Sequence, residues 1–384
     1  MLNGEPIDIE DTNLSEIGSD TDKACKQAAA QLEVNWEGAG TVPGIEIWRI
    51  ENKRNKDGTP NFGINRWPKR KYGKFYRGDS YIVLKTTEVE DSKLIWDVFF
   101  WIGGESTQDE YGVAAYKANE LDDLLGGAPV QHREVEGHES KEFIPGCFKK
   151  GVTYMNGGIE SGFRSTADEK LKEEQAIQKR LFRLRKDGKI LRASEVKCKW
   201  KYLYHGDSFV LDTGNDIYTW FGNECSPFEK NKAANFVTEL EVDRVRCKAH
   251  CDISTEELWE LLGEGDFKNA PEIPASTSDD EKEEEKFTVK AWGIYDGLLW
   301  TKIKEVKEKL TSLDSLKDDQ AYVIDTGKIV YAWIGSNASR SESKSAMKHA
   351  TNYLKIMKKP MYTGIVRCLQ GQEAFCGFNG NVFG

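Results

Sequence analysis

The sequence predicts an α+β fold that is repeated three times along one chain. A motif in which an apolar strand ends in Trp-x-Gly recurs as FFWIGG (99–104), YTWFGN (218–223) and YAWIGS (331–336). Its tryptophans lie 119 and 113 residues apart, a period that suits a small globular domain and is too long for a solenoid unit. Strand-like segments precede each motif and a helical pattern follows it. Each copy is therefore expected to form a sheet with a helix packed on it.

Each copy supplies the same elements in the same order. The strand directly before the motif is SYIVL (80–84), SFVLD (208–212) or AYVID (321–325). An earlier strand is expected in the segments 45–50, 180–184 and 290–295. After the motif, apolar residues recur at helical spacing and predict a core-facing stripe. Its members are Ala114, Ala118, Leu121, Ala233, Val237, Leu240, Ala346, Ala350 and Tyr353.

Polar stretches mark the boundaries between the copies. The segment 271–286 holds two prolines and an acidic run, and such a composition favours a solvated linker. The expected organisation is a tail at 1–43, a first domain at 44–164, a linker at 165–177, a second domain at 178–270, an acidic linker at 271–286 and a third domain at 287–384.

Composition excludes several classes of function. The chain has 384 residues and a formal net charge of −10, which argues against a dedicated nucleic-acid binder. No apolar run approaches the ~20 residues that cross a bilayer, and the acidic first twenty residues do not resemble a signal peptide. The eight cysteines have no framework spacing and are expected to be mostly buried thiols. We therefore expect a cytoplasmic protein.

The sequence gives little support for an enzyme. It contains no HExxH, GxSxG or P-loop motif. Two pairs of adjacent acids, Asp109–Glu110 and Asp122–Asp123, diverge on a helix and form no natural acid–base couple. We expect no catalytic residues, and a carboxylate-based hydrolase is the weakest of the alternatives.

Three glutamates at helix starts have two interpretations. Thr107-x-x-Glu110, Ser226-x-x-Glu229 and Ser339-x-x-Glu342 each form a capping box, which explains the glutamates without a metal. However, the first two copies also carry Gly78-Asp79 and Gly206-Asp207 before the motif. A glycine carbonyl, a carboxylate and a helix-start glutamate are oxygen donors that Ca²⁺ prefers. The third copy has Asp319-Gln320 there, so its site is expected to be weaker or absent.

The helix expected at 107–125 has a second apolar face. Val113 and Tyr116 lie on its outer flank, where the other two copies have polar residues. This face could pack against the protein itself, or it could enter a groove on a partner. Asp122 near the helix end, followed by Gly126-Gly127, could place another cation there, although an ordinary glycine C-cap explains the pattern equally well.

A basic strip stands out on this acidic chain. Residues 178–205 carry ten Lys or Arg and two acids, a local balance of 10 − 2 = +8. A strip of this kind attracts an acidic filament or an anionic lipid headgroup, unless it is simply a solvated strand face.

The repeats and motifs together resemble the gelsolin family in its three-domain form, typified by severin and fragmin. The resemblance covers about residues 36–384 and is most specific in YGKFYRGDSYIVL (72–84), STQDEYGVAAYK (106–117) and HGDSFVLDTGNDIYTWFG (205–222). It implies three domains, each a mixed central sheet flanked by one long and one short helix. Ser208 and Phe221 stand where extracellular members have a cysteine pair.

The resemblance also implies a function and a set of site residues. It implies a monomeric, calcium-dependent protein that binds actin monomers and filaments, severs filaments, caps barbed ends, nucleates assembly and is inhibited by phosphoinositides. Capping or bundling without severing is the alternative. The implied metal ligands are Gly78, Asp79, Glu110 and Ile159; Asp122, Gly127 and Pro129; Gly206, Asp207, Glu229 and Asp279; and Glu342. The implied actin-binding residues are Val113, Tyr116, Lys117, Glu120 and Leu124. The implied phosphoinositide- or filament-binding residues are Lys149, Lys150, Lys179, Arg180, Arg183, Arg185, Lys186, Lys189 and Arg192.

Overall fold

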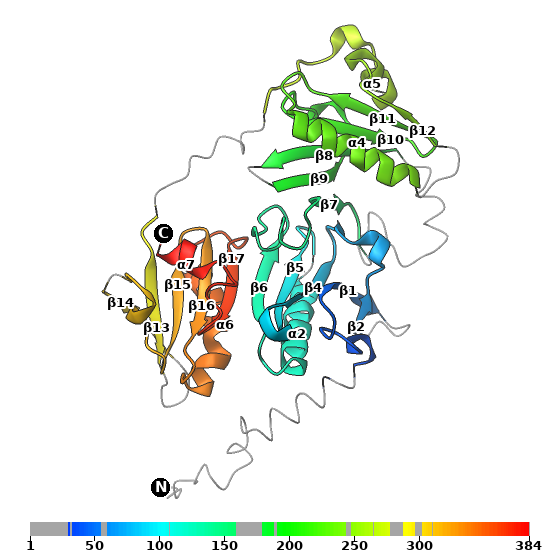
Figure 1. Ribbon diagram of the computed structural model, residues 1–384. Coiled ribbons are helices and arrows are strands. Elements are labelled where there is room, and N and C mark those ends of the chain that lie inside the picture. Colours follow the sequence, from blue (N-terminus) through cyan, green and yellow to red (C-terminus); the bar gives the residue numbers. More distant parts are fainter. Residues whose placement is uncertain are drawn as a thin grey trace, which may run out of the picture.

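The computed structural model confirms the α+β fold and places the three copies around two sheets (Figure 1). It describes residues 30, 33–54, 60–106, 108–158, 179–187, 190–242, 247–263, 265–276, 287–295, 302–308 and 310–383. Among these residues, no helix is both long and apolar enough to span a membrane.

The first copy forms one long helix and seven strands. The strands are β1 (Gly44–Arg54), β2 (Pro60–Arg66), β3 (Lys74–Tyr76), β4 (Ser80–Glu88), β5 (Leu94–Ile102), β6 (Val130–Val135) and β7 (Val152–Met155). The helix is α2 (Gln108–Leu124), and a short 3-10 helix, η2 (Val34–Trp36), precedes β1. Trp36 lies in the core of this domain, so residues that the sequence analysis assigned to the tail pack with domain 1.

The second and third copies repeat this plan with fewer strands. The second has β8 (Arg180–Asp187), β9 (Ile190–Val196), β10 (Ser208–Asp212), β11 (Asp216–Phe221), α4 (Pro227–Val242), β12 (Lys248–His250) and α5 (Thr255–Leu262). The third has β13 (Lys290–Tyr295), β14 (Lys302–Val306), β15 (Ala321–Asp325), β16 (Ile329–Ile334), α6 (Arg340–Ile356), β17 (Gly364–Leu369) and α7 (Phe378–Val382).

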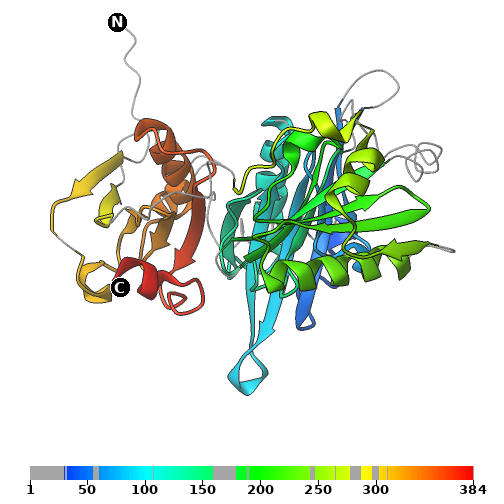
Figure 2. The same ribbon diagram turned by 90° about the horizontal axis from the view of Figure 1, so that it is seen from above.

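The sheets run across domain boundaries. One sheet has the order β14-β13-β15-β16-β17-β6-β5-β4-β1-β2, so the first and third domains share it through antiparallel pairing of β17 with β6. The other has the order β12-β11-β10-β8-β9-β7-β3, in which β7 and β3 of the first domain extend the sheet of the second. Figure 2, the view from above, shows the third domain beside the first, with the second domain in front of the first.

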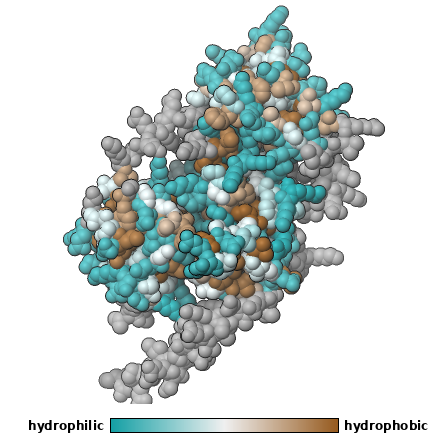
Figure 3. Space-filling model, viewed as in Figure 1, coloured by the Kyte–Doolittle hydropathy of each residue, from teal (hydrophilic) through white to brown (hydrophobic). Residues whose placement is uncertain are grey.

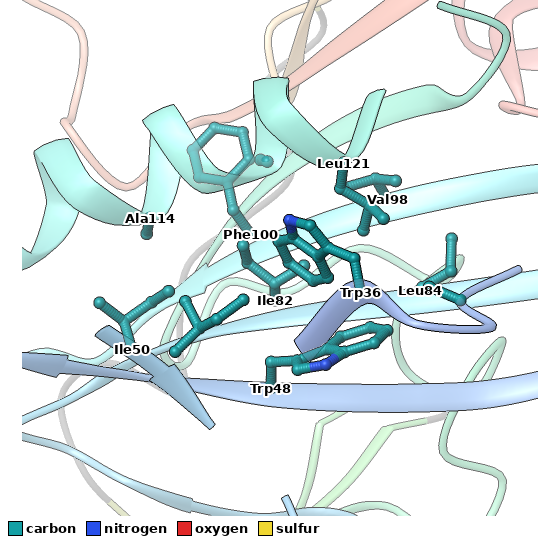
Figure 4. Packing of buried hydrophobic residues seen from close by; sticks show 12 residues of the cluster. Trp36, Trp48, Ile50, Ile82, Leu84, Val98, Phe100, Ala114 and Leu121 are labelled. Carbon is teal, nitrogen blue, oxygen red and sulfur yellow. The ribbon is translucent and has the colours of Figure 1, made fainter. Parts of the chain in front are cut away.

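The helical stripes predicted from periodicity are buried as expected. In the first domain, Ala114, Ala118 and Leu121 of α2 pack on a core that contains Trp36 and Trp48, whose rings meet edge to face at 4.9 Å (Figure 4). The corresponding residues of α4 and α6 are buried in the same way. Burying this apolar surface stabilises each helix on its sheet. On the face seen in Figure 3, the remaining exposed hydrophobic residues form separate small groups among hydrophilic ones.

The glycines of the three Trp-x-Gly motifs bring the loop after each motif strand close to the segment that begins the preceding strand. A Cβ on Gly103, Gly222 or Gly335 would lie 2.2 Å from the carbonyl oxygen of Arg77, His205 or Asp318, respectively. No other residue allows this approach. Each glycine donates its N–H to the backbone carbonyl of the residue that precedes the strand in that copy, namely Asp79, Asp207 or Gln320.

Candidate functional site

The Asp79 carboxylate is fully buried where β4 meets the motif loop. Gly78 N donates to Gly157 O at 2.8 Å, which brings the 157–158 backbone against the aspartate. Arg49 Nε and Nη2 lie 2.7 and 2.5 Å from Asp79 Oδ2. On the other side of the carboxylate, a Cβ on Gly158 would lie 2.8 Å from Asp79 Oδ1.

This environment fits a hard cation. The buried carboxylate packs closely against glycine backbone, and carboxylate and backbone carbonyl oxygens are the ligands that Ca²⁺ prefers. Two of the four predicted ligands cannot be compared with this geometry, because the Glu110 side chain and Ile159 lie outside the described residues.

The second domain repeats the arrangement. Gly206 N donates to Ala275 O at 2.7 Å, and Arg183 Nε lies 2.6 Å from Asp207 Oδ2. Burial raises the pKa of the Asp207 carboxyl to about 6, and the negative charge of Glu229 adds to the effect against the opposing Arg183. A cation between these acids would relieve this destabilisation. Asp279 lies outside the described residues.

The helix-start glutamates are caps in this structure. Glu229 Oε2 accepts hydrogen bonds from Ser226 N and Ser226 Oγ at 2.8 and 2.7 Å, and its Oε1 accepts one from Lys186 N. Ser339 and Glu342 form a reciprocal capping box. The capping interpretation is therefore confirmed for these two residues, and it leaves metal binding by either of them a prediction.

The third domain has an amide, Gln320, at the position of the Asp79 and Asp207 carboxylates. Gln320 Oε1 accepts a hydrogen bond from Tyr322 OH at 2.9 Å, and the Asp319 side chain is exposed. The described residues contain no group of three or more His, Cys, Asp and Glu side chains that could hold a metal. The sites considered above combine one or two carboxylates with backbone oxygen atoms instead.

The proposed second cation position, at the end of α2, contacts the third domain. Arg367 Nη1 of β17 donates to Asp122 Oδ2 at 2.9 Å, and its Nη2 donates to Gly127 O at 3.3 Å. Asp122 Oδ1 is buried and has no hydrogen-bond partner among the described residues, so it could accept a cation. Pro129 is buried just before β6. Gly126 and Gly127 adopt positive φ of 73° and 75°, so the glycine C-cap is also present.

The outer face of α2 is only partly available. Tyr116 is 66% exposed, whereas Val113 and Leu124 are half-buried and pack on the domain 1 core. Lys117 Nζ forms ion pairs with Glu33 and Glu120. Glu120 Oε1 also accepts a hydrogen bond from Trp36 Nε1 at 3.0 Å. The segment before β1 therefore holds two of the five predicted actin-binding residues.

The basic strip is divided between the surface and internal contacts. Arg192 is buried and donates to Glu139 and Tyr154 of the first domain, so it is not exposed to a ligand in this arrangement. Arg183 binds Asp207, and Arg180 pairs with Asp212 at 3.1 Å. Lys179 Nζ donates to Leu261 O, Lys186 lies over the Phe228 ring, Arg185 is half-buried and Lys189 is outside the described residues.

Lys149 and Lys150 are exposed and line a cavity of about 340 Å³ between the first two domains. Lys74 and the nearly buried Lys232 also line it, and Lys232 Nζ donates to Lys150 O. Neither Lys74 nor Lys232 was predicted from the sequence, although Lys74 lies in the basic stretch KRKYGKFYR (69–77).

Comparison with known proteins agrees with the repeated geometry. The family model described as "Gelsolin repeat" matches residues 67–144, 189–251 and 302–374, one match in each copy. The chain belongs to the gelsolin family. The matched ranges contain all three Trp-x-Gly motifs and both Asp79 and Asp207. They do not contain Arg49 and Arg183, the arginines on the earlier strands that pair with these aspartates.

Several gelsolin relatives align with most of the chain. It is 39% identical over 357 residues to "Actin depolymerising venom protein gelsolin 1" of Platymeris rhadamanthus, covering 89% of each protein. It is 35% identical to "Gelsolin" of Drosophila melanogaster, covering 91% of this chain and 43% of that protein. It is 36% identical to "Gelsolin, cytoplasmic" of Homarus americanus, covering 88% and 44%. The chain thus spans less than half the length of the latter two relatives.

The chain also contains functional candidates that were not predicted from the sequence. Arg49 and Arg367 contact predicted metal ligands, yet neither lies in a charged run. Arg49 and Arg183 are equivalent only in strand register, since each lies opposite the residue two positions after the aspartate, namely Tyr81 or Phe209. No sequence signal could have identified Arg367, which acts across 245 residues.

Proposed function

We propose that this gelsolin-family protein binds actin and, under calcium control, severs filaments and caps their barbed ends. A relative that matches it over 89% of both chains is named an actin-depolymerising protein. The exposed Tyr116 on α2 supports an actin-facing helix, because large exposed aromatic side chains anchor interfaces. Severing of this kind needs no bond chemistry, since actin–actin contacts are exchanged for contacts between actin and α2. One relative is named cytoplasmic, and we expect the same compartment here.

The contact of Arg367 with Asp122 and Gly127 carries the proposal of calcium control. Calcium would be held at this edge by Asp122 and the backbone oxygens of Gly127 and Pro129, and it would supply positive charge there. Arg367 already binds two of these oxygen atoms from the third domain. A cation and Arg367 would therefore compete, and calcium would favour an arrangement in which β17 leaves β6.

Phosphoinositide inhibition is proposed for the cavity between the first two domains. Lys149, Lys150, Lys74 and Lys232 bring four positive charges together around it, with Glu239 as the one acid in its lining. A phosphorylated headgroup would compensate these charges. Lys179, Arg180, Arg185 and Lys186 are proposed to face the filament or lipid from the second domain.

Dilution of pyrene-labelled filaments tests the function. Severing creates new ends, so we expect faster depolymerisation in calcium than in EGTA, together with shorter filaments by microscopy. Blocked barbed-end growth with unchanged filament length would instead identify a capping protein that does not sever. Equal behaviour of filaments with and without the protein in calcium would contradict actin regulation.

The first-domain calcium ligands have a separate test. We expect the Asp79→Ala and Glu110→Ala double variant to lose one calcium-binding event by isothermal titration calorimetry of the full chain. A Gln320→Ala variant is the control, because the third copy has no carboxylate at that position. Unchanged stoichiometry in the double variant would refute the ligand assignment.

A further inference from the structure

The two repeats with a buried aspartate each carry an arginine at the same place in the sheet. Arg49 of β1 lies opposite Tyr81 of β4, and Arg183 of β8 lies opposite Phe209 of β10. The corresponding residue of the third repeat is Gly293, which lies opposite Tyr322. The three positions are equivalent in register, so the repeats can be compared residue by residue.

An aromatic residue accompanies the arginine in the same two repeats. Tyr76 and Tyr204 each lie three residues before the aspartate. The guanidinium carbon of Arg49 lies 5.0 Å from the Tyr76 ring centroid, and that of Arg183 lies 4.5 Å from the Tyr204 centroid. Such cation–π contacts hold a guanidinium in one place.

The third repeat lacks the arginine, the tyrosine and the aspartate. Gly293, Lys317 and Gln320 stand where the other repeats have arginine, tyrosine and aspartate. The space beside Gly293 is filled by the Tyr295 side chain, whose hydroxyl would lie 2.8 Å from an added Cβ. An arginine that served only the packing of the sheet would have no reason to disappear together with the carboxylate.

Electrostatics explains why the three residues occur together. Asp79 is fully buried and Asp207 is 5% exposed, and a buried ionised carboxylate without a cation nearby is strongly destabilising. In the absence of metal, Arg49 and Arg183 supply that positive charge at 2.5–2.6 Å from Oδ2. A bound calcium ion would supply it in their place, so arginine and calcium stabilise the same carboxylate.

We propose that Arg49 and Arg183, each held by its tyrosine, are internal counter-ions that neutralise the calcium-binding carboxylates when no metal is bound. They thereby set the calcium concentration at which the first and second repeats respond. This inference rests on the proposed calcium-dependent function and assigns the positioning residues that tune it.

Replacement of Arg49 in the full-length protein tests this inference. We expect Arg49→Met to bind calcium about tenfold more tightly at one site, because a positive charge beside the ligand is removed. Its unfolding temperature in EGTA should fall, and calcium should raise that temperature by more than in the wild type. Arg49→Lys keeps the charge and should bind calcium with nearly wild-type affinity. Arg183→Met should repeat the pattern at a second site.

Arg66→Met is the matched control. Arg66 lies opposite Trp48, next to Arg49 in the sheet, but its side chain is 48% exposed and pairs with Glu46 instead of an aspartate ligand. Calcium affinity should not change. Weaker or unchanged binding by Arg49→Met would overturn the counter-ion role. Should Arg49→Met not fold in EGTA, its refolding on calcium addition would support the role, and failure to refold would contradict it.

The outcomes also separate this inference from the proposed function. If wild-type protein binds no calcium by calorimetry, both the calcium switch and the counter-ion role are wrong. If it binds calcium and regulates filaments but Arg49→Met shows no tightening, only the counter-ion role fails.

Discussion

At the scale of single residues, the three motif glycines explain why the same loop recurs. Gly103, Gly222 and Gly335 each lie against a carbonyl oxygen that any Cβ would overlap. The neighbouring tryptophan is buried in each copy, and Trp101 and Trp333 donate to Glu139 and Glu373 at 2.9 and 2.8 Å. The glycine thus positions the backbone, while the tryptophan anchors it in the core.

A glycine replacement tests this close approach. Gly222→Ala places a methyl group 2.2 Å from His205 O, so we expect a loss of about 3 kcal/mol in the free energy of unfolding, measured by urea denaturation. Gly380→Ala is the control, because nothing lies within 4 Å of an added Cβ there. A similar urea midpoint for both variants would show that the loop adjusts without cost.

Glu134 of β6 predicts a pH dependence of stability. Burial raises the pKa of its carboxyl from 4.5 to about 7, against the opposing effects of His132 and of hydrogen bonds from Ser140. The folded protein therefore holds this proton more tightly than the unfolded chain does. The stabilisation is complete below about pH 4.5 and is lost as the pH rises through about 7.

Glu134→Gln removes this titration. Its amide can keep both contacts with Ser140. Between about pH 5 and about pH 8, we expect the free energy of unfolding to fall by about 3 kcal/mol more in the wild type than in the variant. Urea denaturation at several pH values measures this. Parallel pH profiles for the two proteins would contradict the raised pKa.

At the scale of elements, α2 has two faces with different roles. Its inner stripe is buried in the core of the first domain, while Tyr116 on the outer side is 66% exposed. Met347 of α6 packs on the same core as Val113, so the third domain approaches this helix. Only part of the face that the sequence analysis assigned to a partner is open in this arrangement.

Tyr116→Asp tests the outer face without disturbing the core. We expect affinity for monomeric actin to fall by roughly 30-fold, because a charge would replace an exposed aromatic anchor, while the unfolding temperature stays unchanged. Ile356→Asp on α6 is the control, since Ile356 is 69% exposed on another helix. Full actin affinity in Tyr116→Asp would count against α2 as the docking helix.

At the scale of the whole molecule, the shared strand pairing joins the first and third domains. Besides the β6–β17 ladder, Gln372 Nε2 donates to Ala128 O at 2.6 Å, and the His138 and Tyr362 rings stack at 3.6 Å. Val130 of β6 and Met347 of α6 each also pack on the core of the other domain, so this contact between the first and third domains combines polar with apolar groups. Interfaces between domains of one chain resemble transient protein–protein interfaces, so the seam between these domains can separate without unfolding of either domain.

Arg367→Ala tests whether its contact with Asp122 holds the seam closed. We expect a larger radius of gyration in EGTA by small-angle X-ray scattering, and filament severing at about tenfold lower calcium, because one competitor for the cation ligands is removed. Lys348→Ala, an exposed residue of α6, should behave as the wild type. An unchanged radius and calcium threshold in Arg367→Ala would exclude this contact as the restraint.

The sequence by itself determined the repeated architecture of this protein. The fold was predicted from local patterns: Trp-x-Gly, the strands before it and the apolar stripe of each helix. Such patterns can be found in the sequence because the side-chain periodicity of a strand or helix involves residues only a few positions apart. They predicted the α+β fold, the buried helix faces and the position of Asp79 and Asp207 beside the motif loop. The capping boxes of Glu229 and Glu342 could be predicted for the same reason.

Only the tertiary structure decided what these residues contact. Trp36 joins the first core from a segment that looked like a tail, and Arg192 is buried against Glu139 although it looked like part of an exposed basic strip. Arg367 reaches Asp122 because β17 pairs with β6. Pairing between strand edges depends on backbone hydrogen bonds that any sequence can supply, so the joining of domains leaves no pattern in the side chains.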